Sequence, residues 1–87
     1  MPSAPTLVFR PATHDLEWDL PVPPAFSYLV QESADGAHGW SDWDAEVPPD
    51  HSCDDPRPGK FYRVFGTDED GNPVTEYSNV VLDTDPP

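Results

Sequence analysis

Basic residues are scarce in this chain, and their scarcity excludes several classes of partner. Only 4 Lys and Arg accompany 17 Asp and Glu among the 87 residues, so the formal net charge is −13 at pH 7. A field of this sign repels phosphate backbones, which excludes sequence-independent binding of nucleic acid. Anionic membrane surfaces are excluded on the same ground, because they attract clustered Lys and Arg. The acidic residues are expected mainly to keep a small domain soluble, and a basic or cationic partner fits the field best.

Cysteine and long apolar runs are scarce as well. Cys53 is the only cysteine, so no intrachain disulfide is expected and the fold must be held by packing. No segment approaches the ~20 apolar residues of a membrane span, so no membrane insertion is expected. The opening Met-Pro-Ser-Ala-Pro has neither the basic start nor the apolar run of a signal peptide. We therefore expect no secretory entry for the chain as it stands, and leave the question open for a piece of a longer protein.

Aromatic residues are plentiful, and they predict a folded domain. The sequence has 4 Phe, 3 Tyr and 3 Trp beside 13 Pro, and this aromatic content is too high for a disordered chain. The prolines gather between the predicted strands, where they end one strand before the next begins. Length allows a single core. We expect a flexible lead over residues 1–5, one domain over 6–83 and a flexible tail over 84–87.

The hydrophobic pattern has a period of two, which predicts strands. Leu16, Trp18 and Leu20 alternate with acidic residues in the clearest example. The predicted strands are 6–10, 14–20, 26–32, 40–47, 51–54, 60–67 and 77–82. In the third of these, Phe26 is expected on the same side as Tyr28 and Val30. No stretch has helical spacing, so the fold class is all-β, with about seven strands in a two-sheet antiparallel sandwich.

Three groups of residues resemble one family along almost the whole chain. They are Leu16-x-Trp18 followed by Pro21; Tyr28-x-Val30; and the run Pro-Gly-Lys-Phe-Tyr-Arg-Val-Phe-Gly at 58–66, continued by Asp68, Gly71, Ser78 and Asn79. This order and spacing resemble the fibronectin type III family of immunoglobulin-like β-sandwich domains. The resemblance implies a Greek-key sandwich whose structural core contains Leu16, Trp18, Tyr28, Val30, Tyr62 and Val64.

The resemblance also implies roles for individual residues near the sixth strand. The Tyr62 ring is expected in the core, with its hydroxyl bonded to backbone a few residues upstream. Gly59 is expected to adopt a positive φ in the turn before that strand. Pro56 stands where the family commonly has leucine, and the strand around His51 to Cys53 has little apolar character. We therefore expect this edge of the sandwich to be short or irregular.

Two groups of polar residues could suggest metal sites. Asp68, Glu69, Asp70 and Asn72 alternate like ligands of a calcium loop, but Pro73 and Asn79 occupy the positions where an EF-hand needs Gly and Glu. We interpret them as a candidate interaction loop, with weak calcium binding left open.

The other group is His51, Cys53, Asp54 and Asp55. It has one cysteine where a structural zinc site typically has paired ligands, so Cys53 is expected to be a small buried apolar side chain. No catalytic, cofactor or metal residue is assigned, and the chain is predicted not to be an enzyme.

Alternation also predicts a candidate interaction surface. If Tyr28 and Tyr62 point inward, their neighbours on the same strands point outward and could form an exposed apolar strip with a tryptophan. The candidate residues are Leu29, Trp40, Trp43, Phe61, Arg63 and Phe65, where one of the two tryptophans is expected to cover the core edge and the other to be exposed. The alternative is that long neighbouring side chains cover them. The loop 67–74 is a second candidate, because end loops of sandwiches carry many binding sites.

Two functions of different kinds follow from the resemblance, and a third is kept as the enzymatic alternative. The first is a non-catalytic protein-interaction or structural module on a larger assembly, such as a bacteriophage decoration or attachment component on the virion surface, whose partner is a capsid, tail or cell-surface protein. The second is a spacer or adhesion repeat of a secreted bacterial multidomain protein, placed extracellularly. The third, a small metal-dependent enzyme, needs a convergent polar pocket.

Overall fold

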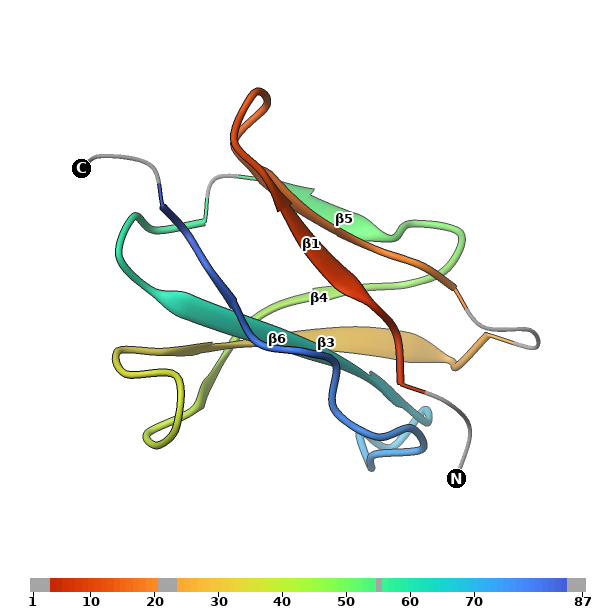
Figure 1. Ribbon diagram of the computed structural model, residues 1–87. Helices are drawn as coiled ribbons and strands as arrows, with labels where there is room; N and C mark the ends of the chain where they lie inside the picture. The colour runs from red at the N-terminus through yellow and green to blue at the C-terminus, as the bar shows by residue number, and fades with distance from the viewer. Residues whose placement is uncertain (1–3, 21–23, 55, 85–87) are drawn as a thin grey trace.

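Seven strands in two antiparallel sheets form the protein in a computed structural model that describes residues 4–20, 24–54 and 56–84 (Figure 1). The strands are β1 (Leu7–Arg10), β2 (Asp15–Trp18), β3 (Ser27–Ser33), β4 (Ser41–Glu46), β5 (Ser52–Asp54), β6 (Phe61–Thr67) and β7 (Val81–Leu82). The predicted all-β, two-sheet antiparallel sandwich is confirmed. The predictions made for Pro21, for Asp55 and for the outermost residues of both ends lie outside the described residues.

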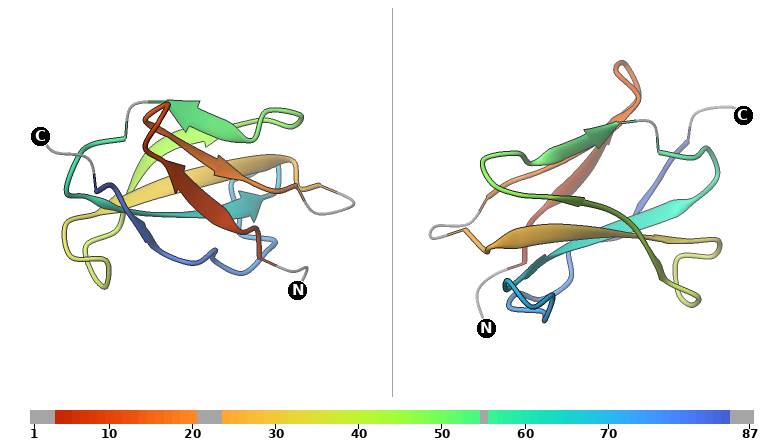
Figure 2. Two further views of the ribbon diagram at one scale, coloured as in Figure 1. Left: turned by 45° about the horizontal axis from the view of Figure 1, so that its top comes forward. Right: turned by 180° about the vertical axis from the view of Figure 1, so that it is seen from behind.

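The chain passes from one sheet to the other three times. One sheet has the order β1-β2-β5 and the other β4-β3-β6-β7, so the chain crosses after β2, after β4 and after β5. Figure 2 shows the three-stranded sheet lying across one face of the four-stranded sheet. The opposite face of the four-stranded sheet is therefore an outer surface.

The core lies between the sheets and contains all six residues predicted for it. Leu16, Trp18, Tyr28, Val30, Tyr62 and Val64 are each at most 1% exposed. The rings of Trp18 and Tyr28 meet across the layers with centroids 6.3 Å apart. Burial of each large side chain stabilises the fold by about 1.5–3 kcal/mol. The inward-facing side chains of β2, β3 and β6 therefore provide the main driving force for folding.

The turn before β6 has the geometry that was predicted for Tyr62. Its hydroxyl accepts a hydrogen bond from the backbone N–H of Arg57 at 2.6 Å and donates one to Glu32 Oε2 at 2.8 Å. Burial, with a smaller effect from Glu32, raises the pKa of Tyr62. Gly59 has φ 81°, as expected, and β5 is only three residues long beside the buried Pro56, so this edge is short as predicted.

The last strand is shorter than predicted, because side-chain hydroxyls take over hydrogen bonds to β6 that a longer strand would make through its backbone. The prediction of 77–82 is wrong for residues 77–80, which belong to no strand. The Ser78 hydroxyl accepts a hydrogen bond from the Val64 N–H at 2.9 Å, and the Thr75 hydroxyl accepts one from the Gly66 N–H at 2.8 Å. The ladder on this side of β6 is therefore completed without a regular strand.

Asn79 connects the two sheets through its side-chain amide. Its Oδ1 accepts a hydrogen bond from the Leu7 N–H at 2.9 Å, and its Nδ2 donates one to the Leu7 carbonyl at 2.9 Å. Both backbone groups of Leu7 are thereby satisfied by one side chain. Asn79 thus takes the place of a strand beside β1.

Gly66 is required on β6 because the chain approaches it closely. A Cβ at this position would lie 2.7 Å from Ala25 Cβ and 2.8 Å from Thr75 Cγ2. Real Cβ atoms do not tolerate such distances, so the loop before β3 and the loop after β6 both press on this glycine. This contact fixes one end of the sandwich.

The edge strand β4 is strongly acidic. It contains Asp42, Asp44 and Glu46, and it pairs only with β3 among the described strands. The Asp44 carboxylate accepts a hydrogen bond from the N–H of Ala45 at 2.8 Å. Burial raises the pKa of Glu46, and the nearby carboxylates Asp44, Asp50 and Asp54 raise it further.

Loss of the Asn79 amide is expected to destabilise the fold. Asn79→Ala leaves the N–H and C=O of Leu7 without their partner, so the free energy of unfolding should fall by about 1–3 kcal/mol. Urea denaturation followed by tryptophan fluorescence measures it. The exposed Glu76→Ala is the control and should change little. A loss no larger for Asn79→Ala than for this control would contradict the role of the amide.

The pair of Arg10 and Asp15 predicts how stability depends on pH. Arg10 Nε and Nη2 donate to the two Asp15 carboxylate oxygens at 3.1 and 2.9 Å. The hydrogen bond with Arg10 lowers the pKa of Asp15 below its ordinary 3.8. A depressed carboxyl pKa stabilises the folded state fully above the ordinary value, and the effect is lost as pH falls through the folded-state pKa.

Asp15→Asn should therefore be less stable than the wild type at neutral pH, and the difference should shrink below about pH 4. Thermal unfolding of both proteins at several pH values between pH 2 and pH 7 tests this, because the difference should be largest at neutral pH and smallest at the acid end. A difference that is constant over the whole range would contradict it.

Candidate functional site

The outer face of the four-stranded sheet carries the side chains that alternation predicted for it. Leu29 pairs with Phe65, and Gln31 pairs with Arg63, on neighbouring positions of β3 and β6. Because Tyr28 and its inward neighbours are fully buried between the sheets, these four residues face away from the core. The predicted outward direction of Leu29, Phe61, Arg63 and Phe65 therefore agrees with the structure.

Arg63 lies between two aromatic rings on this face. Its Cζ atom is 4.3 Å from the centroid of the Trp40 ring and 3.8 Å from that of the Tyr77 ring. Its Nε donates a hydrogen bond to Gln31 Oε1 at 2.8 Å. Two cation–π contacts and one hydrogen bond hold the guanidinium in a single position. Tyr77 is itself half exposed, at 50%.

Phe65 is not part of an exposed strip, so its predicted exposure is wrong. It is only 4% exposed, because the ring of Tyr77 packs against it edge-on with centroids 5.0 Å apart. The alternative of a covering side chain therefore holds at this position. Tyr77 was missed because residues 77–82 were predicted as strand, which gave no reason to fold residue 77 over β6.

Only one of the two tryptophans reaches this face. Trp43 packs against the core, with its ring centroid 5.1 Å from that of Tyr62. The pairing of β3 with β4 shifts between Val30 and Gln31, whose partners are Asp44 and Asp42. Trp43 is the extra residue of this irregularity, so Trp43 is the tryptophan that covers the core edge and is not on the outer strip. Trp40 is the tryptophan on the strip.

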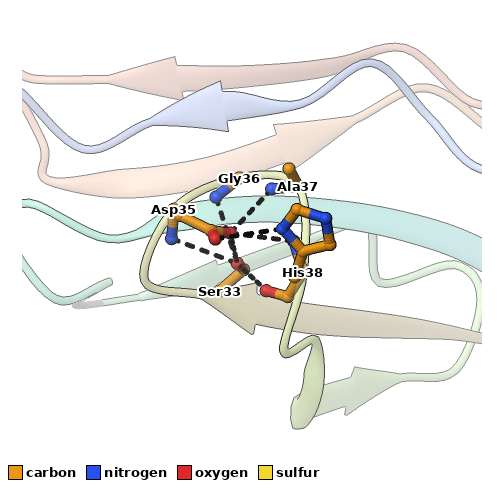
Figure 3. Close-up of polar contacts among 5 residues, drawn as sticks. All are labelled: Ser33, Asp35, Gly36, Ala37 and His38. Atoms are coloured by element: carbon orange, nitrogen blue, oxygen red, sulfur yellow. Dashed lines mark hydrogen bonds and ion pairs between the residues drawn. The ribbon is translucent and has the colours of Figure 1, made fainter.

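A network of hydrogen bonds among residues 33–38 closes the loop between β3 and β4 (Figure 3). Asp35 Oδ1 accepts hydrogen bonds from the N–H groups of His38 and Ala37 at 2.8 and 2.9 Å. These contacts hold the pKa of Asp35 well below its ordinary value. The Ser33 hydroxyl accepts a hydrogen bond from the Gly36 N–H at 3.0 Å. The turn at Asp35 and Gly36, where Gly36 has a positive φ, thus has a defined shape.

We call the resulting surface the aromatic face. Phe61 pairs directly with Leu82 of β7, which places both side chains on the same side of the sheet. Leu82 is 39% exposed. The aromatic face comprises Trp40, Phe61, Arg63, Tyr77 and Leu82. It combines exposed apolar area with one immobilised positive charge.

In the candidate loop after β6, the Asp68 carboxylate forms hydrogen bonds within the loop itself. Asp68 Oδ1 accepts hydrogen bonds from the N–H groups of Asp70 and Asn72, both at 2.9 Å. The Asn72 backbone N–H lowers the pKa of Asp68 most. Asp70 and Glu69 are exposed. In the described ranges, no group of three or more His, Cys, Asp and Glu residues is placed to hold a metal ion.

An open groove of about 240 Å³ lies beside this loop, at one end of the sheet. The residues that line it are Phe26, Ser27, Leu29, Ala45, Thr67, Asp68, Glu69 and Gly71. Phe26 was predicted to share the inward side with Tyr28, and this is wrong because β3 begins only at Ser27. Its side chain is 57% exposed and forms a wall of the groove.

A second hollow, of about 370 Å³, lies on the other sheet. Its lining comprises Thr6, Val8, Glu17, Trp18, Asp19 and His51. Nearby, His51 Nδ1 lies 2.7 Å from the Trp18 carbonyl, while Cys53 is 4% exposed in the core. Burial, aided by neighbouring carboxylates, raises the pKa of the Cys53 thiol to about 12. Cys53 is a buried apolar side chain, as predicted.

Comparison with known proteins finds no family model, no curated protein and no solved structure that matches the chain. Within the part of the chain that the structure describes, no helix has the length and apolarity needed to cross a membrane.

The buried thiol is expected to be chemically inert. Since the thiolate is the reactive form, a raised pKa and burial should slow modification of Cys53 by an aromatic disulfide reagent at pH 8 roughly a hundredfold relative to the urea-unfolded chain. Absorbance of the released thiol measures both rates. Comparable rates in the folded and unfolded proteins would show that Cys53 is accessible.

Proposed function

We propose that this chain is a non-catalytic protein-interaction or structural module of a larger assembly, and that the aromatic face is its contact surface. The observation that carries the proposal is the stack in which Arg63 lies between Trp40 and Tyr77. Trp, Tyr and Arg dominate the binding energy of protein interfaces, and side chains already fixed before binding lose little entropy on contact.

The resemblance to fibronectin type III domains supports this class of function. That family serves as attachment and spacing modules, so the chain fits a bacteriophage decoration or attachment component on a virion surface, with a capsid, tail or cell-surface protein as partner. A spacer or adhesion repeat of a secreted multidomain protein is the second candidate. The neighbouring genes and the intact open reading frame distinguish the two.

Charge supports a protein partner over other partners. The net charge of −13 opposes nucleic acid and anionic membrane surfaces. Arg63 is one of only 4 basic residues, and it is placed at the centre of the aromatic face. A partner that docks there meets an apolar surface around a single cation, which is the composition of a protein interface rather than of a phosphate-binding surface.

Removal of the exposed ring of Tyr77 is expected to abolish partner capture. Immobilised wild-type protein is incubated with a lysate and a virion fraction of the source cells, and bound proteins are identified by mass spectrometry. Tyr77→Ser should lose the captured protein at least about tenfold, as for an interface hot spot. Val8→Ser, a similarly exposed position on the other sheet, is the matched control.

Circular dichroism establishes that both variants fold. A protein captured equally by the wild type and Tyr77→Ser would contradict the aromatic face as contact surface. Turnover of a substrate by the purified chain would contradict the non-catalytic assignment.

A further inference from the structure

The groove beside the loop after β6 differs from the aromatic face in chemistry. We propose that it anchors a flexible segment of another protein, in which an apolar side chain stands next to Lys or Arg. This inference rests on the proposed function as a protein-interaction module, but it uses a separate surface. The apolar side chain enters the groove, and the basic side chain reaches the carboxylates on its rim.

The size of the groove decides what kind of ligand it takes. Its volume is about 240 Å³, which is below the ~300–1,000 Å³ typical of pockets for small organic ligands. Phe26, Leu29 and Ala45 supply an apolar wall and floor. A space of this size and lining suits a single apolar side chain of a peptide rather than a whole cofactor or sugar.

The charge of the groove rim determines which residue of the partner segment should stand next to its apolar side chain. Asp68 and Glu69 line the groove, and none of the described residues in its lining is basic. Hydrogen bonds from the loop backbone stabilise the ionised form of Asp68, so this charge persists at neutral pH. The whole chain adds a long-range field of the same sign. Electrostatic complementarity therefore selects a cationic segment and rejects an acidic one.

Both walls of the groove are fixed before any partner arrives. On one side, the N–H of Ala25 donates a hydrogen bond to the Tyr28 hydroxyl at 3.1 Å, and Ala25 also packs on Gly66. Phe26 is therefore held at the start of β3. On the other side, the loop is closed by the bonds to Asp68 and by a hydrogen bond from the Gly71 N–H to the Asp68 carbonyl at 3.1 Å. A preformed groove loses little entropy on binding.

The test is a titration of the ¹⁵N-labelled full chain with three synthetic peptides. The first is Gly-Ser-Lys-Leu-Lys-Ser-Gly; the second has Glu in place of both Lys, and the third has Ser in place of Leu. Single-anchor contacts are weak, so the peptides are added to about 5 mM. Amide shifts of Ser27, Leu29 and Gly71 should appear with the first peptide and be nearly absent with the other two.

Two variants locate the binding. Phe26→Ser removes the apolar wall and Glu69→Gln removes a rim charge, and each should weaken binding of the first peptide about threefold to tenfold. Val8→Ser and Glu76→Gln are matched controls of similar exposure outside the groove, and both should bind as the wild type does. The dispersion of the amide spectrum establishes that all variants fold.

Three outcomes would overturn the proposed role of the groove: no shift with the first peptide, equal shifts with the acidic peptide, or unchanged binding by both groove variants. Shifts confined to Arg63 and Tyr77 would also overturn it, while leaving the aromatic face and the proposed function in place. Conversely, peptide binding in the groove together with equal capture by Tyr77→Ser would support the groove and refute the aromatic face.

Discussion

The Tyr62 hydroxyl is the contact on which the arrangement of this small sandwich depends most. Its ring is fully buried between the sheets, while its oxygen accepts from the Arg57 backbone and donates to Glu32. One side chain thus connects the core, the crossing between β5 and β6, and the neighbouring strand β3. Because a buried hydroxyl requires partners, the turn can adopt few other paths. This bond holds the start of β6 in place, and alternation along the strand then directs Arg63 to the outer face.

Side-chain hydroxyls and one side-chain amide also satisfy backbone groups near the other edge of the four-stranded sheet. Ser78 and Thr75 satisfy N–H groups of β6, and Asn79 satisfies both backbone groups of Leu7. A segment that is free of strand pairing can change direction. This freedom is what allows Tyr77 to lie over Phe65 and beside Arg63. The aromatic face therefore exists because the last strand is short.

The core could be read from the sequence, whereas much of the surface could not. Alternation is a local signal that put Leu16 and Trp18 on one face of their strand, and the motif around Tyr62 implied a buried ring. All three side chains lie in the core. The side of the sheet on which Trp43 lies could not be predicted, because a shift in the β3–β4 pairing register turns it toward the core. No residue type in either strand indicates where this shift occurs. Phe26 was misplaced because the strand starts one residue later than predicted.

The same distinction explains the candidate site. Leu29, Phe61 and Arg63 were predicted to face outward because they lie on regular strands. Tyr77 comes from a segment outside the strands, and its position depends on side-chain bonds between residues far apart in the sequence. The groove likewise joins the starts and ends of three strands with a loop. Such juxtapositions are products of tertiary packing, which a single sequence does not display.

The acidic edge strand has a consequence for how copies of the chain can stand beside one another. An uncharged edge strand offers unpaired backbone groups to any similar strand and so promotes sheet-to-sheet polymerisation. Here two copies approaching through β4 would bring Asp42, Asp44 and Glu46 against their own equivalents. Mutual repulsion would oppose pairing of two copies through this edge. Two copies can thus lie side by side along β4 without joining into one continuous sheet through that edge.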